Sequence, residues 1–173
     1  MATDYQRALH TLQHWINSDT EQQRFAVRTL SAAEWVDIAE VTDMRLPAAY
    51  YEFIRQIGVG EFFLKNAHQG MFCLYDADGL RQNQRFLAEH LLNQDISMND
   101  EYLMVGVHQS MGDWMGFNVS RADERCFDVY DHAAPVDEYA EIANWRRFEE
   151  WVWRWWQVMA WIVCKTVMRF AML

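Results

Sequence analysis

The chain of 173 residues is poor in the residues that mark disordered, disulfide-rich and metal-bound domains. It contains 7 glycines and 2 prolines while 51% of its residues are hydrophobic, which excludes a disordered chain. Its three cysteines, Cys73, Cys126 and Cys164, are widely spaced and include no Cys-x-x-Cys pair, so neither a disulfide framework nor a zinc site is indicated. We expect one domain whose core is built from apolar side chains, with the cysteines inside it.

Two further absences concern membranes and export. The first nine residues hold no cationic segment followed by an apolar run, so no secretory signal is visible and the cytoplasm is the expected location. After residue 151 the longest run without a charged residue is Trp155 to Cys164, which is ten residues. Because about 20 apolar residues are needed to cross a bilayer, we expect no membrane span.

Basic residues are scarce and unevenly placed. The chain has 25 acidic and 15 basic residues, a net charge of −10. All acidic residues lie before residue 151, so residues 1–150 carry −13, and the only charged residues beyond are Arg154, Lys165 and Arg169. An acidic body repels nucleic acid and anionic lipid and attracts basic proteins. Solubility alone is the simpler explanation of the same charge.

The first 60 residues are dominated by helical patterns. Apolar residues recur at helical spacing near the start: Tyr5, Leu9, Leu12 and Ile16. Residues 24–30 alternate as in a strand, but a helix through Phe25 fits them as well. Ser31, followed three residues later by Glu34, has the pattern of a capping box and predicts the start of another helix. Pro47 suits the first turn of the next helix, which Gly58 is placed to end in a left-handed turn.

The second half is dominated by short apolar runs. Strands are predicted at residues 71–75, 102–107, 114–119 and 126–130, with a helix after Asp78 between the first two. The short connections between the last three of these strands favour an antiparallel meander. A final helix is predicted where aromatic residues repeat every three to four positions: Trp145, Phe148, Trp151 and Trp155. We therefore predict an α+β fold: an antiparallel-rich mixed sheet flanked by helices, with N-terminal helices and a Trp-rich C-terminal helix.

This order of elements, with one particular set of residues, resembles the SUKH superfamily over residues 31–156. The residues that match the family's best-marked stretch are Leu46, Pro47, Tyr50, Phe53, Gly58 and Gly60. The resemblance predicts a single domain over residues 1–156 and an apolar extension over residues 157–173. Bacterial members of the superfamily are mostly immunity proteins, and fungal members regulate cell-wall assembly.

The resemblance implies a non-enzymatic binding protein. The first alternative is an immunity protein that neutralises a cognate toxin, possibly a nuclease with a basic surface; the second is a regulatory or scaffold protein of the cell-wall regulator type. Residues 95–144 hold eleven acidic residues against two arginines. The predicted partner-binding residues come from this acidic segment: Asp113, Trp114, Asp123, Glu124, Asp131, Asp137 and Glu138.

Tryptophan placement leaves two questions open. Asp113 and Trp114 together present a carboxylate beside an aromatic ring, as interface hot spots do, but Trp114 fits an inward-facing strand position equally well. Trp153 and Trp156 lie off the buried stripe of the final helix and indicate either an extra intramolecular layer or an oligomer contact. We favour the oligomer contact, formed together with Trp161.

Enzyme signals are weak. The best polar cluster combines Asp128, Asp131 and His132, and it lacks a recognised ligand pattern. His10 and His14 stand one helical turn apart without a third ligand nearby. The glycines at 58 and 60 lack the lysine of a phosphate-binding loop. We expect no catalytic residue, no metal, no cofactor and no nucleic-acid partner.

Overall fold

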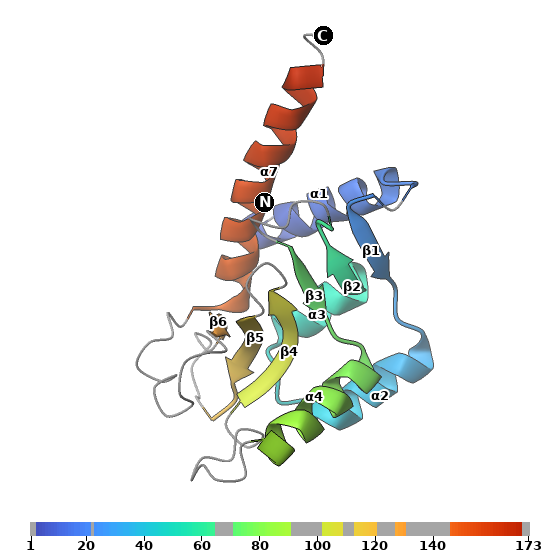
Figure 1. Cartoon of the computed structure of the whole chain (residues 1–173), viewed down its shortest axis with the longest axis vertical. Coiled ribbons are helices and arrows are strands. Elements are labelled where there is room, and N and C mark those ends of the chain that lie inside the picture. Colours follow the sequence, from blue (N-terminus) through green and yellow to red (C-terminus); the bar gives the residue numbers. More distant parts are fainter. Residues whose placement is uncertain are drawn as a thin grey trace.

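The computed structural model of the chain describes residues 3–21, 23–64, 71–90, 102–108, 113–120, 127–130 and 146–170. This part of the chain contains both helices and strands (Figure 1). The helices are α1 (Asp4–Ser18), α2 (Ala32–Thr42), α3 (Ala48–Gln56), α4 (Ala77–His90) and α7 (Phe148–Phe170). The strands are β1 (Phe25–Arg28), β2 (Val59–Phe62), β3 (Phe72–Leu74), β4 (Tyr102–His108), β5 (Asp113–Asn118) and β6 (Phe127–Tyr130). The predicted α+β fold is confirmed.

The strands form one sheet in chain order, β1-β2-β3-β4-β5-β6. Each described strand pairs antiparallel with the next one along the chain. The predicted meander over β4 to β6 is therefore confirmed, and β1, β2 and β3 extend it. The register shifts once, between Met104 and Gly106 of β4, where a bulge lets the strand keep its pairing on both sides.

Local capping signals set two helix starts. Ser31 and Glu34 form the predicted capping box: the Ser31 hydroxyl accepts the Glu34 backbone N–H, and the Glu34 carboxylate accepts the Ser31 backbone N–H. Helix α4 begins two residues earlier than the sequence predicts, because the carboxylate of Asp76 accepts the backbone N–H of Gly79 at 2.9 Å. Asp78 lies inside the first turn instead of preceding it.

Strand β2 was missed in the sequence, because its glycines read as a turn. Gly58 and Gly60 have φ angles of 108° and 124°, a region open to glycine but strained for other residues. A Cβ on Gly60 would lie 2.2 Å from the carbonyl oxygen of Ala26 on the neighbouring strand. Both glycines therefore allow β1 and β2 to approach closely. This explains why these two positions of the family motif are glycine.

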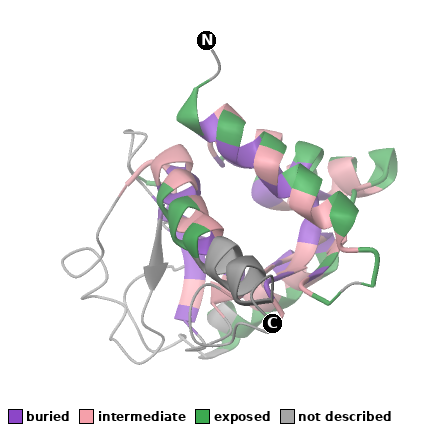
Figure 2. Ribbon diagram, turned by 90° about the horizontal axis from the view of Figure 1, so that it is seen from above, coloured by how far each residue is buried: buried purple, intermediate pink, exposed green. Residues whose placement is uncertain are grey.

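Helices α1, α3 and α7 cover one face of the sheet, which we call the inner face (Figure 2). The hydroxyl of Tyr5 on α1 donates a 2.6 Å hydrogen bond to the carbonyl oxygen of Ala49 on α3. The side-chain amide of the next residue, Gln6, donates to the carboxylate of Glu52, one turn further along α3, at 2.8 Å. These bonds fix α1 against α3 where both also meet α7.

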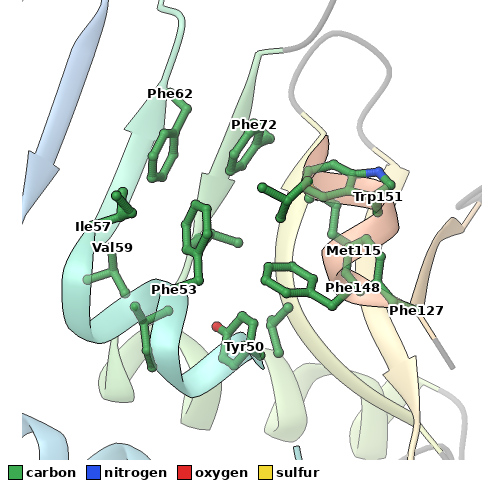
Figure 3. Packing of buried hydrophobic residues seen from close by; sticks show 14 of the residues in the cluster. Tyr50, Phe53, Ile57, Val59, Phe62, Phe72, Met115, Phe127, Phe148 and Trp151 are labelled. Atoms are coloured by element: carbon green, nitrogen blue, oxygen red, sulfur yellow. The ribbon is translucent and has the colours of Figure 1, made fainter. Parts of the chain in front are cut away.

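The core between the inner face and these helices is aromatic (Figure 3). Phe62 of β2 and Phe72 of β3 stack with their ring centroids 4.5 Å apart. Phe53 of α3 packs tilted against Phe62 and edge-on against Phe148 of α7. Trp151 of α7 packs edge-on against Phe72 and stacks on Phe148. Burying each such side chain contributes about 1.5 to 3 kcal/mol, so the helix and sheet layers are held together mainly by aromatic packing.

Helices α2 and α4 lie side by side at one end of the sheet (Figure 1). Arg81 of α4 reaches Asp37 of α2 at 3.7 Å. The buried hydroxyl of Thr42 at the end of α2 lies 2.8 Å from the hydroxyl of Tyr51, which ties this pair of helices to α3. The rest of the sheet face opposite to the inner face is not covered by a described helix.

Helix α7 is longer than the sequence predicts. Its aromatic repeat was expected to end near Trp155, whereas the helix continues without a break to Phe170. The last turns extend beyond the body of the molecule (Figure 1). Within the described residues, none of the helices combines the length and apolar character that crossing a membrane requires.

Candidate partner-binding face

The face of the sheet opposite to the inner face, the outer face, carries one continuous row of residues. Successive residues of a strand point to opposite faces, so the register assigns each side chain to a face. The outer row crosses the sheet strand by strand and consists of Ala26, Glu61, Cys73, Val107, Trp114 and Tyr130. From Ala26 to Trp114 each side chain of this row is exposed or half-buried, whereas Phe25, Phe62 and Phe72 of the neighbouring row on the inner face are buried.

Trp114 is the largest side chain described on this row. It is half-buried, and it pairs across the strands with Val107 of β4. The two alternatives for this tryptophan, an interface position and an inward-facing strand position, are therefore resolved in favour of the outer face. A partly exposed tryptophan on a sheet surface offers a large, rigid contact area.

The outer face is hollowed over β1, β2 and β3. The outer hollow has a volume of about 380 Å³ and is lined by Ala26, Val27, Arg28, Val59, Gly60, Cys73, Leu74, Tyr75 and Asp76. It exists because small residues meet there: Ala26 and Cys73 stand on either side of Glu61 in the outer row, and Gly60 next to them has no side chain. The lining is mostly apolar, with charged groups at the rim.

The rim of the outer hollow is held by ion pairs. The guanidinium of Arg28 contacts Glu34 at 2.5 Å and Asp76 at 2.9 Å. The hydrogen bond to Glu34, together with the bond to Asp76, raises the pKa of Arg28 against the opposing effect of desolvation. One cation is thus shared between two carboxylates, of which Asp76 lines the hollow itself.

The thiol of Cys73 lines the same hollow. Burial raises its pKa to about 11, and the carboxylates of Glu61 and Asp76 act in the same direction. A thiol with such a pKa is protonated at neutral pH and is a poor nucleophile. The hollow is therefore not suited to cysteine chemistry.

The structure separates Asp113 from its neighbour Trp114. The sequence predicts a turn that presents both, but Asp113 is the first residue of β5 and only 8% exposed. It stands opposite His108 on the inner-face side of the sheet. Burial lowers the pKa of His108, although the negative charge of Asp113 opposes this shift. The carboxylate of Asp113 thus belongs to the edge of the core and not to an exposed turn.

The other predicted partner-binding residues lie outside the described residues: Asp123, Glu124, Asp131, Asp137 and Glu138. The same holds for His132 of the polar cluster considered as an enzyme signal. Among the residues that the structure describes, no group of three or more histidine, cysteine or carboxylate side chains is arranged to hold a metal ion.

The tryptophans of α7 differ in their surroundings. Trp153 and Trp156 are half-buried and stack on each other with centroids 4.7 Å apart. The guanidinium of Arg7 on α1 lies 5.6 Å from the centroid of Trp153, so these two rings contact their own chain. Trp161, two turns beyond Trp153, is 59% exposed. A second hollow, of about 340 Å³, separates the starts of α1 and α7 and is lined in part by Tyr5 and Trp153.

These features define an α+β binding module with an open sheet face. The model of the SMI1 / KNR4 family (SUKH-1) matches residues 29–154. The chain therefore belongs to this family, whose domains are of the immunity or cell-wall regulator type and act through protein–protein contacts. No curated protein and no solved structure gives a significant match. The expected SUKH resemblance is thereby confirmed.

Proposed function

We propose that this domain is an intracellular immunity protein that neutralises a cognate toxin, possibly a nuclease, by binding a basic surface of that toxin. The observation that carries the proposal is the open outer face of an acidic body, where Trp114 lies half-buried on a row of exposed and half-buried side chains. A toxin that handles nucleic acid presents positive charge at its active site, and an acidic inhibitor gains fast association from complementary potentials. The domain acts in this proposal by occlusion, without catalysis.

Family membership and surface chemistry support the proposal in different ways. The SMI1 / KNR4 family is generally non-enzymatic, and immunity is one of its two known types of role. The acidic segment from Asp95 to Asn144 of the sequence holds further carboxylates, including the predicted Asp123, Glu124, Asp131, Asp137 and Glu138. Its charge steers a basic partner, while Trp114 supplies contact area once the partner has docked.

The test pairs the full chain with the toxin domain encoded next to its gene. Growth of cells that express the toxin should be restored by the wild-type chain. In binding measured by surface plasmon resonance, Trp114→Ala should raise Kd about 30-fold, as at an interface hot spot. Glu61→Lys should mainly slow association and weaken its salt dependence, because the reversed charge reduces the attraction that salt screens.

Matched controls separate the outer face from general effects. Trp161→Ala removes a tryptophan that is exposed on α7, and Glu21→Lys reverses an exposed charge in the turn before β1. Both should leave toxin binding within about twofold, as expected for substitutions outside an interface. If the wild-type chain neither protects cells nor binds the toxin, the immunity role is wrong. If the controls weaken binding as much as the outer-face variants, the outer face is not the surface that binds the toxin.

A second candidate function rests on a different surface. Val158 and Trp161 are 53% and 59% exposed on the part of α7 that extends beyond the body. Exposed apolar residues on a projecting helix favour a scaffold role of the cell-wall regulator type, with α7 as the predicted oligomer contact. Sedimentation velocity distinguishes this candidate: self-association of the wild-type chain that Trp161→Gln abolishes would support it, and a monomer at high concentration would contradict it.

A further inference from the structure

The end of helix α7 differs in charge and in exposed apolar area from the rest of the chain. Val158 and Trp161 are 53% and 59% exposed, and they lie three residues apart, so both side chains are on one side of the helix. This part of α7 extends beyond the body of the molecule (Figure 1). In the sequence, every charged residue after position 151 is basic, whereas residues 1–150 carry −13. An exposed tryptophan thus stands on a basic helix end that leaves an acidic body.

This charge distribution determines which surface of a second copy suits the end of α7. Two projecting α7 ends that paired with each other would bring Lys165 and Arg169 of one copy near the same residues of the other, and like charges repel. The acidic body of a second copy attracts the same helix end. Electrostatics therefore favours a head-to-tail contact over a symmetric contact between two α7 ends.

The outer hollow offers an apolar cavity on that acidic body. Its volume of about 380 Å³ is near the lower end of the range for small-ligand pockets, about 300 to 1,000 Å³, so it can hold one large side chain but not a helix. Arg28 and Asp76, the charged residues that line it, pair with each other at 2.9 Å. The charge of the lining is therefore balanced, and the hollow is suited to an uncharged, apolar group.

The second hollow, between the starts of α1 and α7, is a poorer receptor for such a group. Most of the residues that line it are polar or charged: Thr3, Asp4, Arg147, Glu149 and Glu150. An aromatic ring inserted there would remove water from charged groups without replacing their hydrogen bonds. Between the two hollows, the outer hollow is therefore the better match for a tryptophan.

We propose that Trp161 of one copy inserts into the outer hollow of a second copy of this chain. The proposal deepens the scaffold role given above as the second candidate function and rests on it for the self-association. An indole is large, rigid and mainly apolar, so it can fill such a hollow at a small cost in conformational entropy. The contact is heterologous, so it joins copies into a ring or an open chain. It also covers the outer face, so a second copy and a bound toxin exclude each other.

The first experiment compares two variants, alone and mixed, by sedimentation velocity. Trp161→Gln removes the inserted ring, and Ala26→Gln places a longer side chain at the hollow from an exposed position of β1. Each variant alone should self-associate at least about tenfold more weakly than the wild-type chain. An equal mixture should form a 1:1 complex, because one variant keeps the tryptophan and the other keeps the open hollow. Ala88→Gln, the same substitution at an exposed position of α4, should self-associate like the wild-type chain.

The outcomes separate the inserted tryptophan from the scaffold role itself. A wild-type chain that stays monomeric at high concentration contradicts both. If Ala26→Gln self-associates as strongly as the wild-type chain, or if the mixture forms no 1:1 complex, α7 binds another surface. That result would overturn the contact proposed here and leave the scaffold role standing.

A crosslinking experiment tests the same contact without altering the hollow. The photoreactive residue p-benzoylphenylalanine replaces Trp161, and this chain is mixed with an isotope-labelled wild-type chain, so that mass identifies crosslinks between copies. We expect crosslinks to the strands that line the hollow, β1 (Phe25–Arg28) and β3 (Phe72–Leu74). Crosslinks from position 161 to α7 of the labelled chain would show a symmetric contact and refute the proposal.

Charge removal tests the choice of the acidic body. A chain with both Lys165→Gln and Arg169→Gln should self-associate more weakly than the wild-type chain, and its association should depend less on salt, because the attraction that salt screens is reduced. Arg85→Gln, at an exposed position of α4, is the control and should stay within about twofold of the wild-type chain. Stronger self-association of the double variant would show that the basic ends repel each other in a symmetric contact, which contradicts the head-to-tail arrangement.

Discussion

The carboxylate of Asp19 accepts the backbone N–H of Phe25 at 2.9 Å, which fixes the first residue of the edge strand β1. The same carboxylate accepts the N–H groups of Arg24 at 2.7 Å and Gln23 at 3.2 Å. Desolvation acts to raise the pKa of Asp19, but these backbone bonds and the charge of Arg24 outweigh it and lower the pKa. A short edge strand that is capped in this way offers little backbone to a foreign strand.

Asp19→Asn should therefore destabilise the fold by about 1 to 2 kcal/mol at neutral pH, the loss expected for charge-assisted hydrogen bonds. The folded-state pKa lies below the unfolded value of about 3.9, so this contribution is present above pH 4 and is lost as pH falls through the folded pKa. Urea unfolding of both proteins from pH 7 to pH 3 measures it. The two curves should converge at low pH, and Glu21→Gln should show no comparable effect.

Gly60→Ala should destabilise the protein by more than 2 kcal/mol, or prevent folding. The new Cβ would lie 2.2 Å from the carbonyl oxygen of Ala26 and would hold a residue at a φ of 124°. Each strained backbone conformation costs about 1 to 3 kcal/mol before any steric clash. Thermal unfolding monitored by circular dichroism gives the value. Gly79→Ala, in a helix, is the comparison and should cost less, and equal costs would contradict this account of β2.

Phe148→Ala should cost about 3 to 5 kcal/mol, because Phe148 is fully buried where α7 meets α3 and the sheet. Phe86→Ala removes the same side chain from α4, where it is 46% exposed. That variant should lose about 1 kcal/mol at most. Chemical denaturation of both variants tests the difference. A small cost at Phe148 would show that α7 is not needed to close the core.

The thiol of Cys73 should react slowly with iodoacetamide. Its pKa is raised from an ordinary 9.0 to about 11, so the folded protein holds about 100-fold less thiolate than an open thiol does at pH 8. In a chain with Cys126→Ser and Cys164→Ser, mass spectrometry should show a labelling rate that rises tenfold per pH unit and increases sharply in denaturant. Glu61→Gln should speed labelling at pH 8. Fast labelling of the folded protein would contradict the burial of this thiol.

Those features of the fold that depend on residues close in the sequence could be predicted from the sequence. The capping box of Ser31 and Glu34 forms as expected, since its partners are three residues apart. The strands β3 to β6 follow from short apolar runs. Strand β2 was not predicted, because the two glycines that its close contact with β1 requires are the residues that usually mark a turn. The local sequence pattern of this segment favours a turn, whereas its packing against β1 requires a strand.

The candidate site was less accessible to sequence reasoning. Trp114 was identified, but the outer hollow arises from Ala26, Gly60 and Cys73, which only the register of three strands brings together. Nothing in the sequence near any of these residues indicates a cavity. The exposure of Asp113 was predicted wrongly, because a Gly-Asp pair suggests a turn while the position begins a strand beside the core. To predict such a site, one would have to know which strands pair and in which register.

The chain order of the elements has a consequence for synthesis on the ribosome. All six strands pair with their neighbours in sequence, so the sheet can assemble progressively as the nascent chain emerges. Helix α7, which supplies Phe148 and Trp151 to the aromatic layer, follows every strand. Until it is synthesised, the rings of Phe62 and Phe72 lack their cover, and the growing polypeptide presents an apolar surface of the kind that chaperones bind.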